Sequence, residues 1–199
     1  MTTTIFLVRH AAHDLLGRVL TGRMVGVRLG AEGRRQSERL AERLSREEIV
    51  AVYSSPLERA RETAAPIAER LGLRVETRDA ITDLDFGDWS GRSFDELDAD
   101  PRWAKWNGAR ATARPPGDES MLDAQWRAVG EVERVVGAHP QESVVMVSHA
   151  DVIKAVLAYY LGLALDGIAR FEVSPASIST VLIGAWGAKV HAINEVVAT

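Results

Sequence analysis

The sequence has no cysteine, which excludes a disulfide framework, a cysteine zinc site and a thiol nucleophile. Lysine is almost as scarce: arginine supplies 21 of the 24 basic residues, so anion recognition here would use the planar guanidinium fork. Positive charge is not in excess, because the formal net charge is −4 at pH 7, and this argues against general nucleic-acid binding.

Long apolar runs are also missing. No segment approaches the roughly 20 residues that a membrane-spanning helix needs. The start, "MTTTIFLVRH", lacks the basic region and the apolar stretch of a signal peptide, so we expect a cytoplasmic protein with no membrane partner. The composition, 46% hydrophobic and 26% charged over 199 residues without repeats or a linker, predicts one globular domain over residues 1–199.

Short apolar runs rich in β-branched residues alternate with helical patterns. The predicted strands are 4–9, 49–54, 73–77, 143–148, 177–184 and 188–194. The predicted helices are 31–46, 56–71, 119–137 and 151–161. Continuous rather than alternating apolar strands suit a sheet that is covered on both faces. This order predicts a three-layer α/β/α sandwich with a mostly parallel central sheet and antiparallel character at the C-terminal edge.

The helix over 119–137 and the segment before it, residues 86–118, lead to separate predictions. Within that helix, apolar residues recur on one predicted core face, and Glu119 is expected to cap its start. The face consists of Leu122, Trp126, Val129, Val132 and Val136. Residues 86–118 show no regular pattern but contain three tryptophans, which we expect to pack the segment. We predict that this irregular stretch forms a lid or specificity wall.

Basic side chains follow three of the predicted strands. Arg9 and His10 end the first, Arg59 lies in the helix after the second, and His149 ends the fourth, where a helix begins near Ala150. Ligands of open α/β sheets bind outside the carboxyl ends of the strands. Helix N-termini offer free N–H groups there, and arginines bind anions in a bidentate manner. The sequence therefore predicts a pocket for a dianion the size of phosphate.

Such a pocket supports chemistry as well as binding. A neutral imidazole can attack phosphorus and form a covalent intermediate, which divides one difficult transfer into two easier ones. The departing alkoxide needs a proton, which a carboxyl group kept protonated by its surroundings can supply. The turn "ITDLDFGDWSG" holds Asp83, Asp85 and Asp88 as candidates, and for Asp85 a local hydrogen bond is the more ordinary role.

Five motifs, "LVRHA", "YSSPLERARETA", "DLDFGDWSG", "PPGDES" and "VVMVSHADVI", occur in the order and at the approximate spacing of the histidine phosphatase (phosphoglycerate mutase-like) superfamily, which the chain resembles over nearly its whole length. The resemblance implies that His10 is the phosphorylated nucleophile and that Asp83 stands where the family usually has its glutamate proton donor. It also implies which groups hold the phosphoryl group: Arg9, Arg59, His149 and the amide of Ala150.

The segment "LTGRMVGVRLGAEGRRQ" resembles the stretch after the family's nucleophile, so Thr21 and Gly22 are expected to line the pocket. The chain departs from the pattern at four positions: Ala11 and Ala12 replace a glycine and a glutamate, His13 a serine, and Leu16 an asparagine. A histidine in the place of His13 most often lies on the surface; the alternative, a place in the pocket wall, makes it a candidate substrate-binding residue. Lost polar contacts and missing insertions favour a phosphatase over a mutase.

The prediction is a metal-independent phosphomonoester hydrolase without a cofactor, whose partner is a small phosphorylated substrate rather than a nucleic acid. The alternatives are a phosphoglycerate mutase-type phosphoryl transferase and a non-catalytic protein that binds a phospho-ligand. A metallohydrolase is a third, for which the arginines beside the ligands are unsuited; its ligands would be His10, His13, His149, Asp85 and Asp151. The C-terminal edge strand could pair two chains into a homodimer.

Overall fold

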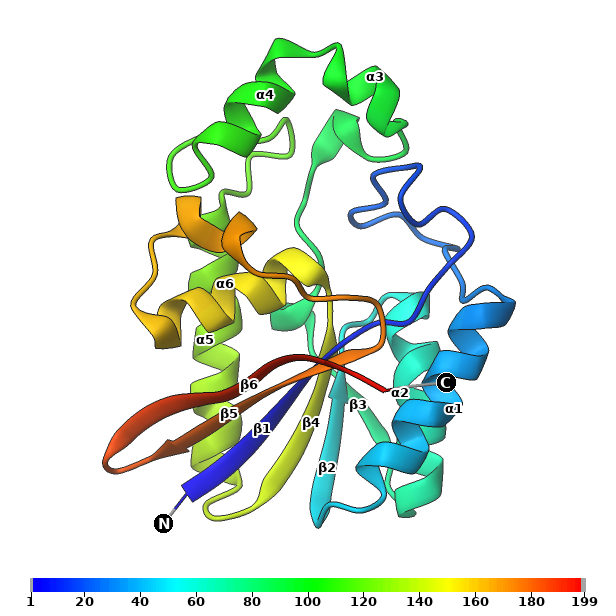
Figure 1. The fold of residues 1–199 in the computed structure, drawn as a ribbon, viewed down its shortest axis with the longest axis vertical. Coiled ribbons are helices and arrows are strands. Elements are labelled where there is room, and N and C mark those ends of the chain that lie inside the picture. The colour runs from blue at the N-terminus through cyan, green and yellow to red at the C-terminus, as the bar shows by residue number, and fades with distance from the viewer. Residues whose placement is uncertain (1, 198–199) are drawn as a thin grey trace.

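The computed structural model describes residues 2–197, and Figure 1 shows their arrangement. The strands are β1 (Thr2–Arg9), β2 (Ile49–Ser54), β3 (Val75–Thr77), β4 (Ser143–Ser148), β5 (Ser177–Gly184) and β6 (Gly187–Val196). The helices are α1 (Ala31–Leu44), α2 (Glu58–Leu71), α3 (Phe94–Asp98), α4 (Pro101–Gly108), α5 (Met121–Ala138) and α6 (Ala150–Leu161). Short 3-10 turns are η1 (Asp79–Ile81), η2 (Gly87–Trp89) and η3 (Leu165–Arg170).

The strands form one sheet in the order β3-β2-β4-β1-β5-β6. The first four in that order run parallel, and β5 and β6 are antiparallel to their neighbours, which confirms the predicted mixed edge. Arg9 at the end of β1 pairs with Ser148 at the end of β4, and Ser54 of β2 pairs with Val147. This register brings the carboxyl ends of three strands to the same level, so the residues after them become neighbours.

Helices cover both faces of the sheet, as the continuous apolar strands predicted (Figure 1). In β1, Phe6 and Val8 pack into the core shared with α1 and α2, whereas Ile5 and Leu7 pack into the core shared with α5 and α6. Side chains alternate between the faces of a strand, so a strand that is apolar on both faces supplies two cores at once. The predicted three-layer α/β/α sandwich is confirmed.

The buried face of α5 differs from the prediction. Trp126 is 67% exposed and Leu122 is 43% exposed. Val129 and Val132 are buried as predicted, and Val136 packs against the core. The remaining core positions of the helix are Met121, Ala124, Ala128 and Val135, which were not predicted. α5 packs against α6 along this face, and the side-chain amide of Gln125 donates to the Ala155 carbonyl of α6 at 2.8 Å. The prediction gave weight only to large apolar side chains, and it therefore placed part of the buried face of α5 on the wrong side of the helix.

The start of α5 is also corrected. Ser120, not Glu119, is the N-cap: its hydroxyl accepts from the Asp123 amide, and the Asp123 carboxylate accepts from the Ser120 amide. This reciprocal pair satisfies two amides that a helix start leaves free. Glu119 is thereby left to make other contacts, which bear on the site described below.

Residues 86–118 are more regular than expected, since they include α3 and α4, and they lie beyond the carboxyl ends of the strands (Figure 1). Both helices begin at caps, Ser93 for α3 and Asp100 for α4. The tryptophans pack the segment as predicted: Trp89 and Trp106 are fully buried. Caps rather than apolar periodicity specify these short helices, which explains why the periodic pattern did not reveal them.

Candidate active site

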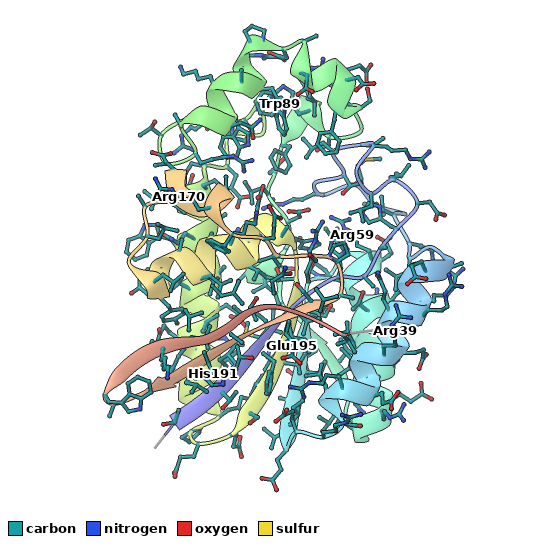
Figure 2. All side chains as sticks on the ribbon, viewed as in Figure 1. Arg39, Arg59, Trp89, Arg170, His191 and Glu195 are labelled. Carbon is teal, nitrogen blue, oxygen red and sulfur yellow. The ribbon has the colours of Figure 1, made fainter. Side chains whose placement is uncertain are left out.

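The predicted site residues gather around one pocket of about 340 Å³. Its lining includes Arg9, His10, His13, Thr21, Gly22, Asp83, His149 and Ala150. His10 follows β1 and His149 follows β4, and their ring centroids are 5.2 Å apart. Arg59 lies against this group at the end of the sheet that faces residues 86–118 (Figure 2).

Arg59 is fully buried, and the first turn of α2 carries it. Its Nη2 donates to the Gly22 carbonyl at 2.6 Å and to the Asp83 carboxylate at 3.0 Å. Gly22 has φ +45°, a conformation that favours glycine, and this turns its carbonyl toward the guanidinium. Nε and Nη1 of Arg59 are buried without a hydrogen-bond partner.

Arg9 also lacks some of its hydrogen-bond partners. Its Nη1 donates to the Val173 carbonyl at 2.7 Å, while its Nε is buried and unpaired. Leaving a buried charged donor unpaired is costly, so native structures keep such groups mainly where they serve a purpose. The two guanidiniums thus have three unpaired N–H-bearing nitrogens: one on Arg9, which lines the pocket, and two on Arg59, which contacts the lining residues Gly22, Asp83 and His149.

His10 has one ring nitrogen free. Its Nδ1 lies 2.9 Å from the Ala11 carbonyl, which can only accept, so Nδ1 carries the proton and Nε2 holds the lone pair. Burial, followed by the charges of Arg59 and Arg9, holds the pKa of His10 well below its usual range, so the ring is neutral. Thr63 fixes the turn, because its Oγ1 accepts from the Ala11 amide at 2.9 Å.

His149 is oriented by Ser55, the residue that follows β2. The Oγ of Ser55 lies 2.8 Å from His149 Nε2. A hydroxyl both donates and accepts, so Ser55 satisfies Nε2 in either tautomer. Nδ1 lies 3.3 Å from Arg59 Nη2, whose N–H it can accept, and in the other tautomer Nδ1 can donate to an anion. Burial, with Arg59 next, keeps the pKa of His149 well below its ordinary value.

Asp83 lies beside these groups. Its Oδ1 accepts from the Leu84 amide at 2.9 Å, and its Oδ2 is 3.5 Å from His149 Nδ1. Burial raises the pKa of Asp83; the Arg59 charge opposes that shift, and the nearby Asp151 charge adds to it. A carboxyl group with a raised pKa is suited to hold and deliver a proton.

The loop of Asp83 is held by an arginine that the sequence did not reveal as part of the site. Arg127 of α5 donates to the carbonyls of Ala80 and Thr82 at 2.8 Å each, and to that of Asp83 at 3.2 Å. Its Nε donates to Glu119 at 2.7 Å. Every residue has a backbone carbonyl, so contacts with carbonyls cannot be predicted from residue types. The only signal in the sequence was the charge of Arg127 at a predicted helical position.

His13 lies in the pocket wall rather than on the surface, which was the ordinary expectation for it. It is 6% exposed, and its ring stacks on that of His10 with the centroids 5.4 Å apart. Burial, then Arg59 and Arg9, lowers the pKa of His13 to about 4. Its Nδ1 is buried without a partner.

Within residues 2–197, no three histidine, aspartate or glutamate side chains are arranged to hold a metal ion. The ligand set of the metallohydrolase alternative is therefore not assembled there. Asp85 instead accepts from the Gly87 amide at 3.0 Å, the local turn contact expected of it. No helix in the same described range is both long and apolar enough to cross a membrane.

Comparison with known proteins agrees with this geometry. Residues 5–196 match the histidine phosphatase superfamily (branch 1). The chain belongs to that superfamily. This histidine phosphatase is 34% identical to "Phosphoserine phosphatase 1" of Hydrogenobacter thermophilus over 89% of its own length and 85% of the relative's.

It is also 31% identical to the glucosyl-3-phosphoglycerate phosphatase of Mycobacterium tuberculosis, over 80% of this chain and 75% of that one. A solved structure of the mycobacterial glucosyl-3-phosphoglycerate phosphatase superposes with a TM-score of 0.88 at 27% identity, covering 98% and 100% of the two chains. Bacillus stearothermophilus YhfR superposes with a TM-score of 0.91 at 26% identity, covering 98% of each. These similarities establish this histidine phosphatase as a phosphatase.

Proposed function

We propose that His10 is the nucleophile of this phosphatase and that the reaction passes through a phosphohistidine. One observation carries the proposal: a neutral histidine with a free Nε2 lines the pocket beside Arg9, and buried donors of Arg9 and of the adjoining Arg59 have no partner. That combination complements a phosphoryl group, which needs cationic donors for its oxygens and a lone pair for its phosphorus.

In the first step, the non-bridging oxygens bind Arg9, Arg59, His149 Nδ1 and the Ala150 amide at the N-terminus of α6. Nε2 of His10 forms a bond to phosphorus as the bond from phosphorus to the ester oxygen breaks. Asp83 gives its proton to that oxygen, and the alcohol leaves. Thr21, Gly22 and His13 line the space that the substrate enters.

In the second step, Asp83 is the base. It takes a proton from a water molecule whose oxygen attacks phosphorus, and the bond between phosphorus and Nε2 breaks. Inorganic phosphate is released, His10 recovers its lone pair, and Asp83 is protonated again. The cycle needs neither a metal nor a cofactor, since the arginines neutralise the charge that a metal would otherwise stabilise.

The substrate class that we propose is a small phosphorylated metabolite, and the cytoplasm, where such compounds are kept, is the proposed place of action. Two relatives are named for phosphoserine and glucosyl-3-phosphoglycerate, which supports this class. Hydrolysis is favoured over a mutase reaction because Leu16 and His13 stand where the family's asparagine and serine would bind a second polar group.

Turnover of 4-nitrophenyl phosphate tests the proposal. His10→Gln should lower kcat by at least about a thousandfold, whereas the matched His191→Gln, at an exposed position of β6 away from Arg59 (Figure 2), should leave kcat unchanged. EDTA should have no effect on the wild-type rate. Wild-type activity in His10→Gln would refute the assignment of His10 as the nucleophile. Loss of activity in EDTA would refute metal independence.

A further inference from the structure

The wall above the phosphoryl-binding groups is apolar. It is formed by Leu16, Val19, Leu20, Phe86, Phe94 and Pro175. These side chains surround the part of the pocket that a leaving group would occupy, since the arginines and His10 take the phosphoryl end. Apolar walls favour apolar ligand surface and provide no hydrogen bond to a polar one.

This wall is held in place before any substrate binds. Val19 pairs with Ser93 in an isolated β-bridge, which ties the loop after β1 to residues 86–118. The ring of Phe86 meets Trp106 edge-on with the centroids 6.2 Å apart, and Phe94 packs 6.2 Å from Trp103. Because a preformed pocket loses little conformational entropy on binding, its shape and polarity act directly on selectivity.

The charges along the wall disfavour a carboxylate. Among the described residues that line the pocket, Arg9 alone carries a positive charge, and it lies at the phosphoryl end. Asp151 lines the pocket and pairs with Arg110 at 3.0 Å, which occupies that arginine. Arg23 is likewise engaged, by Glu119 at 2.9 Å. A carboxylate on the leaving group would thus meet the ion pair of Asp151 with Arg110 and, beyond the phosphoryl end, no unpaired cation among the described lining residues.

We propose that this enzyme prefers phosphomonoesters whose alcohol carries an alkyl or aryl group and no carboxylate. This inference rests on the proposed function, of which it specifies the substrate. The proposed preference would distinguish this enzyme from the relative named for phosphoserine, because phosphoserine has a carboxylate two carbons from the ester oxygen. The alkyl or aryl group lies against Val19, Leu20 and Phe94 while phosphorus faces His10.

The test compares kcat/KM for 2-phenylethyl phosphate, O-phosphoserine and 3-phosphoglycerate. All three are alkyl phosphates, and the carboxylate-bearing alcohols are the better leaving groups, so intrinsic reactivity favours them. We expect 2-phenylethyl phosphate to be preferred by at least about tenfold, since one or two well-packed apolar groups give discrimination of that order.

A near-isosteric variant locates the effect. Val19→Thr should lower the ratio of kcat/KM for 2-phenylethyl phosphate to kcat/KM for O-phosphoserine by about three- to tenfold. Val25→Thr makes the same change at a position that is 81% exposed, and should alter neither.

Equal or higher kcat/KM for either carboxylate substrate would overturn the inference and leave the proposed function standing. If none of the three esters, nor 4-nitrophenyl phosphate, is turned over, the proposed function fails and the inference fails with it.

Discussion

Replacing Arg127 by methionine should damage the site from a distance. Arg127 hydrogen-bonds none of the side chains proposed to hold the phosphoryl group, but its guanidinium donates to the carbonyls of Ala80, Thr82 and Asp83 and to the Glu119 carboxylate. Methionine keeps much of the length and the apolar stem and removes all of these donors. The loop that carries Asp83 then loses its main attachment to α5.

The cost follows from these contacts. Removing one partner of a buried charged pair typically costs about 3–5 kcal/mol. The Arg127 side chain is 20% exposed, so water can replace part of the lost bonds, and we expect a decrease of about 3 kcal/mol in the free energy of unfolding. For a chain of this length, that corresponds to a Tm lower by about 6–12 °C.

The catalytic effect should depend on the leaving group. A displacement of about 1 Å at a catalytic group can cost about a hundredfold in rate, so kcat/KM for an alkyl phosphate should fall by about 10–100-fold. With 4-nitrophenyl phosphate, whose phenolate leaves without a proton, kcat/KM reports only the formation of the phosphohistidine and should fall by less than about threefold.

Arg134→Met is the matched control. Arg134 lies two turns further along α5 and pairs with Glu131 at 2.5 Å, but contacts no part of the Asp83 loop. Since Arg78 also pairs with Glu131, at 3.1 Å, the control should change the Tm by only a few degrees and neither rate. Equal losses of kcat/KM for both substrates in Arg127→Met would refute the reasoning that Arg127 positions Asp83, the proposed proton donor.

Three further predictions concern protonation and packing. Because burial raises the pKa of Asp83, wild-type kcat for an alkyl phosphate should fall as the pH rises through that raised pKa. Asp83→Asn should be slow at every pH and should not show this decrease. The same decrease at alkaline pH in both proteins would contradict the role of Asp83. The pKa of His13 is lowered from 6.5 to about 4, so between these pH values the unfolded chain binds a proton at His13 and the folded chain does not. In urea unfolding, this group should lower the free energy of unfolding by up to about 3 kcal/mol as the pH drops from 6.5 to 4. The free energy of unfolding of His13→Gln should decrease less over the same pH range. Gly33→Ala places a Cβ 1.9 Å from the Ala12 carbonyl and should cost at least about 1–3 kcal/mol, whereas Gly130→Ala, with open space around it in α5, should stabilise by about 0.5–1 kcal/mol; similar Tm changes of the same sign would contradict this packing.

Much of the site could be predicted from the sequence because parallel strands align their carboxyl ends. The residues that follow β1 and β4 are neighbours as soon as those strands pair, and the pairing of Arg9 with Ser148 makes this exact to one residue. The position of Arg59 follows in the same way from the first turn of a helix after β2. No knowledge of loop conformation was needed for these three.

The parts that were missed depend on contacts rather than on patterns. Arg127 acts through backbone carbonyls, and the bond of Ser55 to His149 joins residues 94 positions apart. The face of α5 was misjudged because Ala124 and Ala128, which pack closely, weigh little in a pattern based on large side chains. The place of His13 depends on how the loop after β1 folds back over the pocket, which local sequence does not specify.

The central claim, a phosphohistidine at His10, is tested most directly by intact-mass analysis of protein quenched during turnover of 4-nitrophenyl phosphate with EDTA present. We predict a single phosphoryl adduct that is lost in acid, is retained in alkali and maps to His10, and that is absent from His10→Gln. His191→Gln should carry the adduct like the wild type. An acid-stable adduct, or one that persists in His10→Gln, would contradict the mechanism.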